Sequence, residues 1–142
     1  MPERKAEARW EGSLKEGKGS VKLAGAQWEG PLSFSARFES GAGTNPEELV
    51  AAAHASCFSM ALSHALAGAG HPPERISTSA TVHLEKGSEG FYIPRIELDT
   101  VGRVPGIDDA TFQQEAEQAK KNCPISKLLK GADITLAARL ER

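Results

Sequence analysis

The stretch Leu49-Val-Ala-Ala-Ala-His-Ala-Ser-Cys-Phe-Ser-Met-Ala-Leu62 predicts a long helix with no charged side chain. Thr44-Asn-Pro-Glu47 precedes it, with Thr44 placed to cap the helix, Glu47 as the acid of a capping box and a proline in the first turn. We expect the helix to end near Ala67, before two glycines. A helix that is apolar or small on every side must be buried on every side. A short chain can achieve this only if a sheet wraps the helix or a second copy covers it.

The segments on either side of this helix predict an α+β fold in a single domain over residues 1–142. Before the helix, alternating apolar residues and turn signals predict strands at Ala6–Leu14, Ser20–Leu23 and Leu32–Phe38. After it, we expect a hairpin of Ile76–Leu84 and Phe91–Val104, helices from Asp108 or Asp109 to Asn122 and over Pro124–Lys130, and a closing strand at Ile134–Leu140.

Composition narrows the class of protein. The 142 residues carry a net charge of −2 and no basic block, so neither nucleic acid nor an anionic membrane is an expected partner. The N-terminus lacks an apolar signal core, and we expect no stretch to reach the length of a membrane span, which favours a cytoplasmic protein. In that compartment a pair of cysteines is more plausibly catalytic than a stable structural disulfide.

Cys123 has the stronger local activation of the two cysteines. It precedes Pro124 where one helix ends and another begins, so it is a candidate N-cap with proline at the first helical position. A thiol there feels the positive end of the helix dipole, and Lys120, Lys121 and Lys127 add positive charge. The alternative is a half-buried cysteine with no chemical role.

Cys57 lies in the middle of the long helix, so a cation from elsewhere would have to activate it. His54, one turn earlier, could act as a base or could simply be hydrogen-bonded. A zinc site with His54 and His64 is disfavoured because the chain has no Cys-x-x-Cys pair. Arg37 is the most interesting cation, on the outward face of the predicted strand before the long helix.

Five motifs together resemble the OsmC family of hydroperoxide-reducing proteins. They occur in order and span nearly the whole chain: Arg9-Trp-Glu-Gly12, Arg37-Phe-Glu39, the run Gly43–Leu62, Val104-Pro-Gly-Ile-Asp108 and Asn122-Cys-Pro-Ile-Ser126. The doubled acid Glu47-Glu48 and the Cys123-Pro motif resemble the OsmC branch more than the organic hydroperoxide resistance branch. The resemblance implies antiparallel sheets wrapped around long central helices in an intertwined homodimer.

The resemblance also implies a thiol peroxidase and assigns its residues. Cys57 would attack the peroxide, Cys123 would resolve the sulfenic acid as a disulfide, and Arg37 with Glu47 would complete the site. The reductant would be a dithiol on a partner protein or a thioredoxin-like protein, with no metal or organic cofactor. An apolar setting, with Phe58, Met60, Leu49 and Phe38, favours organic hydroperoxides over hydrogen peroxide.

Helix geometry adds a constraint on this site. Glu47 and Cys57 are ten positions apart, which places them about 15 Å apart along one helix and about 80° apart around it. If both serve one site, Glu47 and Arg37 must come from a second chain, which predicts a homodimer with composite active sites. Two other functions remain open: a non-catalytic stress-associated binding module with packing cysteines, and a cysteine hydrolase that uses His54 as base.

Overall fold

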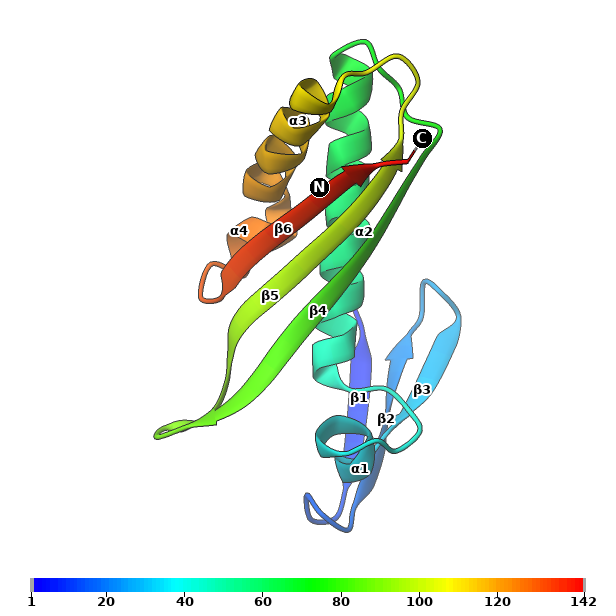
Figure 1. Ribbon diagram of the computed structural model, residues 1–142. Coiled ribbons are helices and arrows are strands. Elements are labelled where there is room, and N and C mark those ends of the chain that lie inside the picture. The colour runs from blue at the N-terminus through cyan, green and yellow to red at the C-terminus, as the bar shows by residue number, and fades with distance from the viewer. Residues whose placement is uncertain (1, 142) are drawn as a thin grey trace. The chain divides into compact units, whose positions relative to one another are not determined.

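The computed structural model describes residues 2–141 (Figure 1). The chain divides into two compact units, Met1–Leu49 and Val50–Arg142. The first unit is built on an antiparallel sheet of three strands in the order β1 (Glu7–Glu11), β2 (Lys18–Leu23) and β3 (Trp28–Leu32). The expected strands at Ala6–Leu14 and Ser20–Leu23 are therefore confirmed, and β3 is a strand that the sequence pattern did not predict.

The expected strand at Leu32–Phe38 is wrong, because a short helix, α1 (Phe34–Phe38), occupies most of it. Ser33 caps this helix by accepting a hydrogen bond from the backbone N–H of Ala36 at 3.0 Å. Phe34 and Phe38 alternate as a strand would require, but they are also four residues apart. That spacing puts both rings on one helix face, with centroids 4.9 Å apart.

The long helix α2 (Pro46–Gly68) forms where the sequence predicts it, but its first turn is capped differently. The side chain of Asn45 accepts from the N–H of Glu48 at 2.7 Å, so Asn45 is the cap in place of Thr44. The hydroxyl of Thr44 donates instead to the carboxylate of Glu48 at 2.5 Å. Glu47 is thereby released from the capping box that the sequence assigned to it.

The second unit contains a mixed sheet in the order β4 (Arg75–Gly87), β5 (Gly90–Arg103) and β6 (Asp133–Leu140). The hairpin and the closing strand are confirmed, and the pairing of β4 with β5 slips near Pro94, which has no N–H to donate. However, β6 runs parallel to β5, so the expectation of purely antiparallel sheets is wrong. A parallel neighbour needs a crossover, and two helices supply it: α3 (Asp109–Asn122) and α4 (Pro124–Leu128).

One face of the β4–β5–β6 sheet is covered by α3 and by the part of α2 that belongs to this unit (Figure 1). Partly buried side chains of β4 and β6 pack against a buried core of apolar side chains from α2, β5, the connection after β5, and α3: Phe58, Leu62, Leu66, Leu98, Val104, Ile107, Phe112, Ala116 and Ala119. The Phe112 ring packs so closely on Gly102 that an added Cβ would come within 2.7 Å of it. The core therefore fixes which side of α2 faces the sheet.

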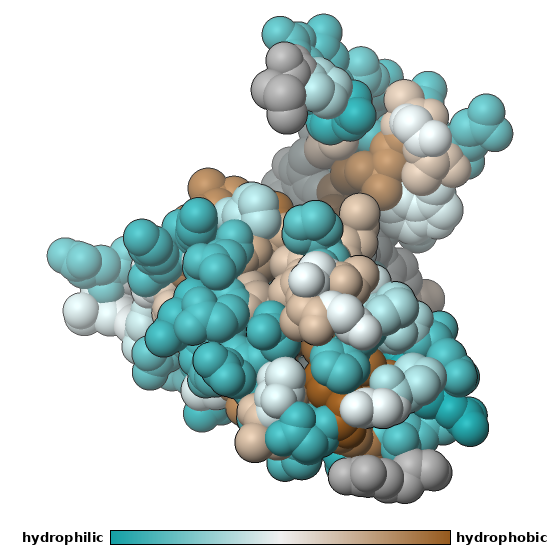
Figure 2. Space-filling view, turned by 90° about the horizontal axis from the view of Figure 1, so that it is seen from above, coloured by the Kyte–Doolittle hydropathy of each residue, from teal (hydrophilic) through white to brown (hydrophobic). Residues whose placement is uncertain are grey.

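The rest of α2 is half-buried or exposed. Only His54, Phe58, Leu62 and Leu66 are buried along its 23 residues, and Met60 is 73% exposed. Among the described residues, α2 is a helix long and apolar enough to cross a membrane, contrary to the expectation that no stretch would be. Length and composition alone are weak evidence, because core helices of other proteins meet the same criterion. Other apolar side chains reach the surface between hydrophilic ones (Figure 2).

Candidate functional site

The two cysteines are in contact inside the second unit. The thiol of Cys123 donates a hydrogen bond to the sulfur of Cys57 at 2.8 Å, although 66 positions separate them in the chain. Cys123 is the N-cap residue of α4, with Pro124 following it as predicted, and it is fully buried. Cys57 is partly exposed and both thiols are free. The end of α3 and the start of α4 thus deliver one thiol onto the middle of α2.

The surroundings of Cys57 within this unit disfavour the thiolate. Burial raises the pKa of Cys57, and the hydrogen bond with Cys123 raises it further. The backbone N–H of Ile125, in the first turn of α4, acts in the opposite direction and lowers this pKa. Among the described residues of the second unit, no cationic side chain lowers the pKa of Cys57. Of the groups that act on the pKa of Cys57, the N–H of Ile125 is the one that favours the thiolate.

His54 makes a second polar contact between α2 and α4. Its Nε2 lies 2.8 Å from the hydroxyl of Ser126, and both residues are buried. Burial lowers the pKa of His54, which keeps the imidazole neutral. Its Nδ1 has no hydrogen-bond partner within residues 2–141. The sequence offered one signal for this contact: His54 precedes Cys57 by three positions, and Ser126 follows Cys123 by three.

Arg37 and Glu47 form a bidentate ion pair in the first unit. The Nε and Nη2 groups of Arg37 each donate to one carboxylate oxygen of Glu47, both at 3.0 Å. Arg37 lies on α1 rather than on the predicted strand, and its guanidinium carbon is 5.2 Å from the centre of the Phe38 ring. Nη1 makes no hydrogen bond with the described residues, so one arm of the guanidinium remains available.

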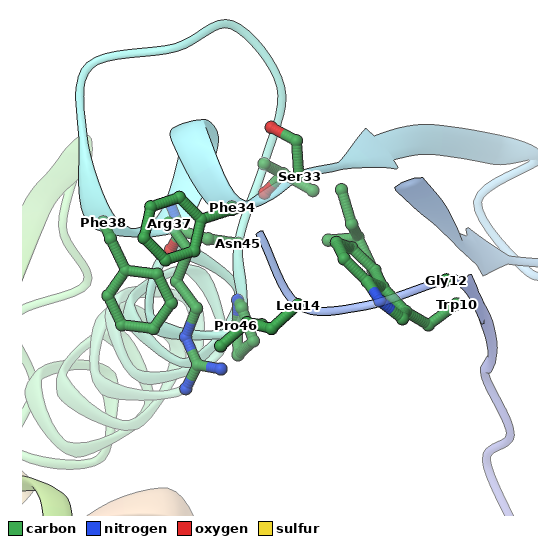
Figure 3. A pocket seen from close by; sticks show the side chains of 11 residues that line it. Trp10, Gly12, Leu14, Ser33, Phe34, Arg37, Phe38, Asn45 and Pro46 are labelled. Carbon is green, nitrogen blue, oxygen red and sulfur yellow. The ribbon is translucent and has the colours of Figure 1, made fainter. Parts of the chain in front are cut away.

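The same unit contains a pocket of about 330 Å³ beside Arg37 (Figure 3). Most of its wall is apolar, with the polar exceptions grouped near Arg37 and the start of α2. The lining residues are Trp10, Gly12, Leu14, Leu32, Ser33, Phe34, Arg37, Phe38, Thr44, Asn45 and Pro46. A cavity with apolar walls and one cation suits a ligand that is mostly hydrocarbon and carries a small polar group.

The apolar residues expected to form a substrate setting are distributed differently. Phe38 does line the pocket, but Phe58 is fully buried in the core of the second unit. Trp10, Leu14 and Phe34 line the pocket and were missed, because nothing in the local pattern distinguishes a pocket wall from a sheet face. No three His, Cys, Asp or Glu side chains of residues 2–141 are grouped as metal ligands.

Comparison with known proteins relates the whole chain to one family. The family model described as "OsmC-like protein" matches residues 39–137. The chain is 49% identical to "Peroxiredoxin OsmC" of Escherichia coli over 97% of this chain and 96% of that protein. It is 37% identical to an "Organic hydroperoxide resistance protein" of Xanthomonas axonopodis pv. citri, over 68% of this chain and 67% of the relative.

Solved structures share the fold across the same length. A protein of Legionella pneumophila described as an organic hydroperoxide resistance protein OsmC superimposes with a TM-score of 0.77 at 23% identity, over all of both chains. OhrB, an organic hydroperoxide resistance protein of Bacillus subtilis, gives a TM-score of 0.74 at 25% identity, over 94% of this chain and 97% of the other. These structures support an α+β fold of this type, with two three-stranded sheets and a long helix.

Proposed function

The chain belongs to the OsmC family, and we infer from this membership and from its paired thiols that it is a thiol-dependent peroxidase that reduces hydroperoxides. The observation that carries the inference is the 2.8 Å contact between Cys57 and Cys123. The contact places each sulfur within reach of the other, with the two cysteines 66 positions apart in the chain. A resolving thiol must contact the sulfur of the sulfenic acid, because the disulfide forms between these two atoms.

In the proposed reaction the thiolate of Cys57 attacks the distal oxygen of the hydroperoxide. The O–O bond breaks, Cys57 becomes a sulfenic acid, and the alkoxide leaves as the alcohol after it takes up a proton. The thiol of Cys123 then attacks the sulfenic sulfur. An S–S bond forms, the S–O bond breaks, and the hydroxyl leaves as water with the proton of Cys123. A dithiol or thioredoxin-like reductant would restore both thiols.

Arg37 is the cation that we propose for this site. Its guanidinium is always charged and can donate to both the thiolate and the developing alkoxide, while Glu47 fixes its orientation through the bidentate pair. Cys57 needs such a charge, because its own unit raises the pKa of the thiol. Ten positions separate Glu47 from Cys57 in the chain, and one straight helix over these positions would hold the two residues about 15 Å apart along its axis. We therefore propose that Arg37 and Glu47 of one chain serve Cys57 of a second copy.

A homodimer also accounts for the uncovered surface of α2. Small and apolar side chains face outward along most of the helix, and packing against the same helix of a second copy would bury them. This explanation places α2 in a protein interface rather than in a membrane, and it agrees with the cytoplasmic location that we propose. The dimer would have two equivalent composite sites.

The substrate class follows from the pocket beside Arg37. Its apolar walls would hold the hydrocarbon part of an organic hydroperoxide while the guanidinium holds the peroxide oxygens. We propose that organic hydroperoxides are preferred over hydrogen peroxide. Turnover of cumene hydroperoxide should exceed that of hydrogen peroxide at equal concentration, and a clear preference for hydrogen peroxide would contradict this assignment.

One experiment tests the peroxidase function directly. The reduced protein is mixed with one equivalent of cumene hydroperoxide, and free thiols and intact mass are followed. A peroxidase loses both thiols and about two mass units as the Cys57–Cys123 disulfide forms. A binding module with packing cysteines would keep both thiols. A cysteine hydrolase would stay reduced while it cleaved an activated ester.

A further inference from the structure

Two polar contacts connect the same parts of α2 and α4, and the peroxidase mechanism uses only one of them. Cys57 meets Cys123, and His54 meets Ser126 at 2.8 Å. His54 lies one helical turn before Cys57, whereas Ser126 lies one turn after Cys123. The two contacts therefore stand side by side, with the chain running in opposite senses through the two segments.

Burying the polar pair His54 and Ser126 costs more free energy than burying an apolar pair of similar size. A buried imidazole and a buried hydroxyl lose their water, which is compensated only where they hydrogen-bond. His54 is compensated at one nitrogen alone, because its Nδ1 has no partner within residues 2–141. A buried polar group without a partner lowers the stability of the folded state. An apolar pair would pack α4 onto α2 without this cost. The presence of the polar pair therefore indicates that the hydrogen bond has a role beyond packing.

The unpartnered Nδ1 of His54 favours one direction for the hydrogen bond with Ser126. Buried N–H groups without a partner are rarer than buried acceptors without one. The favoured tautomer therefore carries its proton on Nε2 and leaves Nδ1 bare. His54 then donates to the hydroxyl oxygen of Ser126.

Helix α4 depends on contacts of this kind for its position. It has only five residues, Pro124–Leu128, and one turn of helix is not stable in isolation. Its start carries three groups that face α2: the thiol of Cys123, the N–H of Ile125 and the hydroxyl of Ser126. The first two both contact the sulfur of Cys57. That sulfur changes during catalysis, whereas the bond between Ser126 and His54 does not depend on it.

We propose that His54 and Ser126 are positioning residues for the resolving step: their hydrogen bond holds α4 against α2 while Cys57 is a sulfenic acid. This inference rests on the proposed peroxidase function. The Cys57–Cys123 sulfur separation of 2.8 Å must fall to the disulfide length of about 2.05 Å, which requires less than 1 Å of motion if α4 stays in place. If α4 drifts, a second hydroperoxide can oxidise the sulfenic acid to the sulfinic acid before Cys123 attacks.

The test separates the two chemical steps in single-turnover experiments with cumene hydroperoxide. Loss of the Cys57 thiol reports the attack, and disulfide formation reports the resolution. In Ser126→Ala we expect the attack rate to stay within about twofold and resolution to slow about fivefold to tenfold, as loss of one hydrogen bond implies. With excess hydroperoxide, Cys57 sulfinic acid should accumulate in the variant and not in the parent protein, as a gain of two oxygen atoms in intact mass.

Conservative and matched variants distinguish positioning from general stability. Ser126→Thr keeps the hydroxyl and His54→Gln keeps an N–H near the position of Nε2, so both should resolve at close to the parental rate. Ser59→Ala removes a different hydrogen bond of α2, the 2.7 Å bond to Thr78, and should not raise the sulfinic acid yield. If Ser126→Ala does not fold, His54→Asn, whose amide is too short to reach Ser126, tests the same bond.

The proposal is overturned if loss of the bond leaves the disulfide rate and the sulfinic acid yield unchanged, if it slows attack and resolution equally, or if Ser59→Ala has the same effect. Failure of the peroxidase function gives a different result, since the parent protein itself would then form no disulfide with hydroperoxide.

Discussion

At the scale of single residues, two adjacent glutamates in the first turn of α2 have different tasks. Glu47 holds Arg37 through two hydrogen bonds of 3.0 Å, whereas Glu48 accepts from the hydroxyl of Thr44 and lies over the capped N-terminus of the helix. Both are carboxylates near the positive end of the helix dipole, so their difference comes from what each one contacts.

Glu47→Gln should lower the rate of Cys57 oxidation by about tenfold, because a neutral amide cannot form the charge-assisted bidentate pair that orients Arg37. Stopped-flow measurement of thiol loss with cumene hydroperoxide gives this rate. Glu48→Gln is the matched control, with a rate within about twofold of the parent protein and a small loss of stability. An equal decrease in the rate of Cys57 oxidation in both variants would mean that the ion pair of Glu47 with Arg37 has no special role.

His54 predicts a specific dependence of stability on pH. Burial lowers its pKa in the folded state below the value of about 6.5 expected when unfolded, so the unfolded chain binds the proton more readily. The contribution of neutral His54 to the free energy of unfolding is fully present above about pH 6.5. It is lost as the pH falls from there toward the folded-state pKa. Urea unfolding measures the free energy of unfolding at pH 7.5 and at pH 5.5. The decrease between the two pH values should be smaller for His54→Gln than for the parent protein. An identical loss would show that His54 does not titrate in this way.

At the scale of secondary structure, the start of α2 is held by a single side chain with two bonds. Asn45 accepts from the N–H of Glu48 at 2.7 Å and donates from Nδ2 to the carbonyl of Ala36 at 2.9 Å. The second bond ties the cap of α2 to α1, the helix that carries Arg37. The cap therefore positions Arg37 and Glu47 in addition to ending the helix.

Asn45→Ala should reduce the free energy of unfolding by about 1–2 kcal/mol, since it removes both the cap and the link to α1. Asn45→Asp keeps the acceptor for the N–H of Glu48 and removes only the donor to Ala36. The free energy of unfolding should therefore fall less in this variant than in Asn45→Ala. Chemical denaturation of both variants measures the difference. The assignment of the cap to Asn45 would be wrong if Thr44→Val destabilised the protein more than Asn45→Ala.

The elements show where a local pattern is sufficient and where it fails. The uncharged run of α2 and the alternation of β4 predict their elements correctly, because each has one period and a clear boundary. The segment Leu32–Phe38 fits two periods at once, with phenylalanines at a spacing that suits a strand and a helix. The cap at Ser33 and the ring contact of Phe34 with Phe38 select the helix.

At the scale of the whole molecule, the single chain leaves two needs unmet. Cys57 lacks a cation in its own unit, and α2 exposes small and apolar side chains along most of its length. A second copy would meet both needs with one interface. This is the physical basis of the proposed dimer with composite sites.

Subunit mixing tests the composite site without a structure of the dimer. Arg37→Met and Cys57→Ser should each be inactive alone. Unfolded together and refolded at equal amounts, they should recover about a quarter of the parental activity, because half of the dimers are mixed and each mixed dimer has one intact site. Recovery fails if Arg37 acts on Cys57 of its own chain. A monomer in sedimentation that retains activity would also contradict the dimer.

The sequence by itself determined the central helix, the order of the elements that follow it and, through motifs along the chain, the family and the four residues proposed for catalysis. These features are encoded locally, in periods, caps and spacings. Only the tertiary structure decided that β6 runs parallel to β5, that Arg37 lies on a helix and that Asn45 frees Glu47 to pair with it. It also decided the contact of His54 with Ser126 and of Cys57 with Cys123. The parallel pairing of β6 and these two contacts depend on segments far apart in the chain, which meet only after the helices have packed on the sheet. The helix that carries Arg37 and the cap at Asn45 are local, but each competes with another local option that the sequence pattern does not exclude.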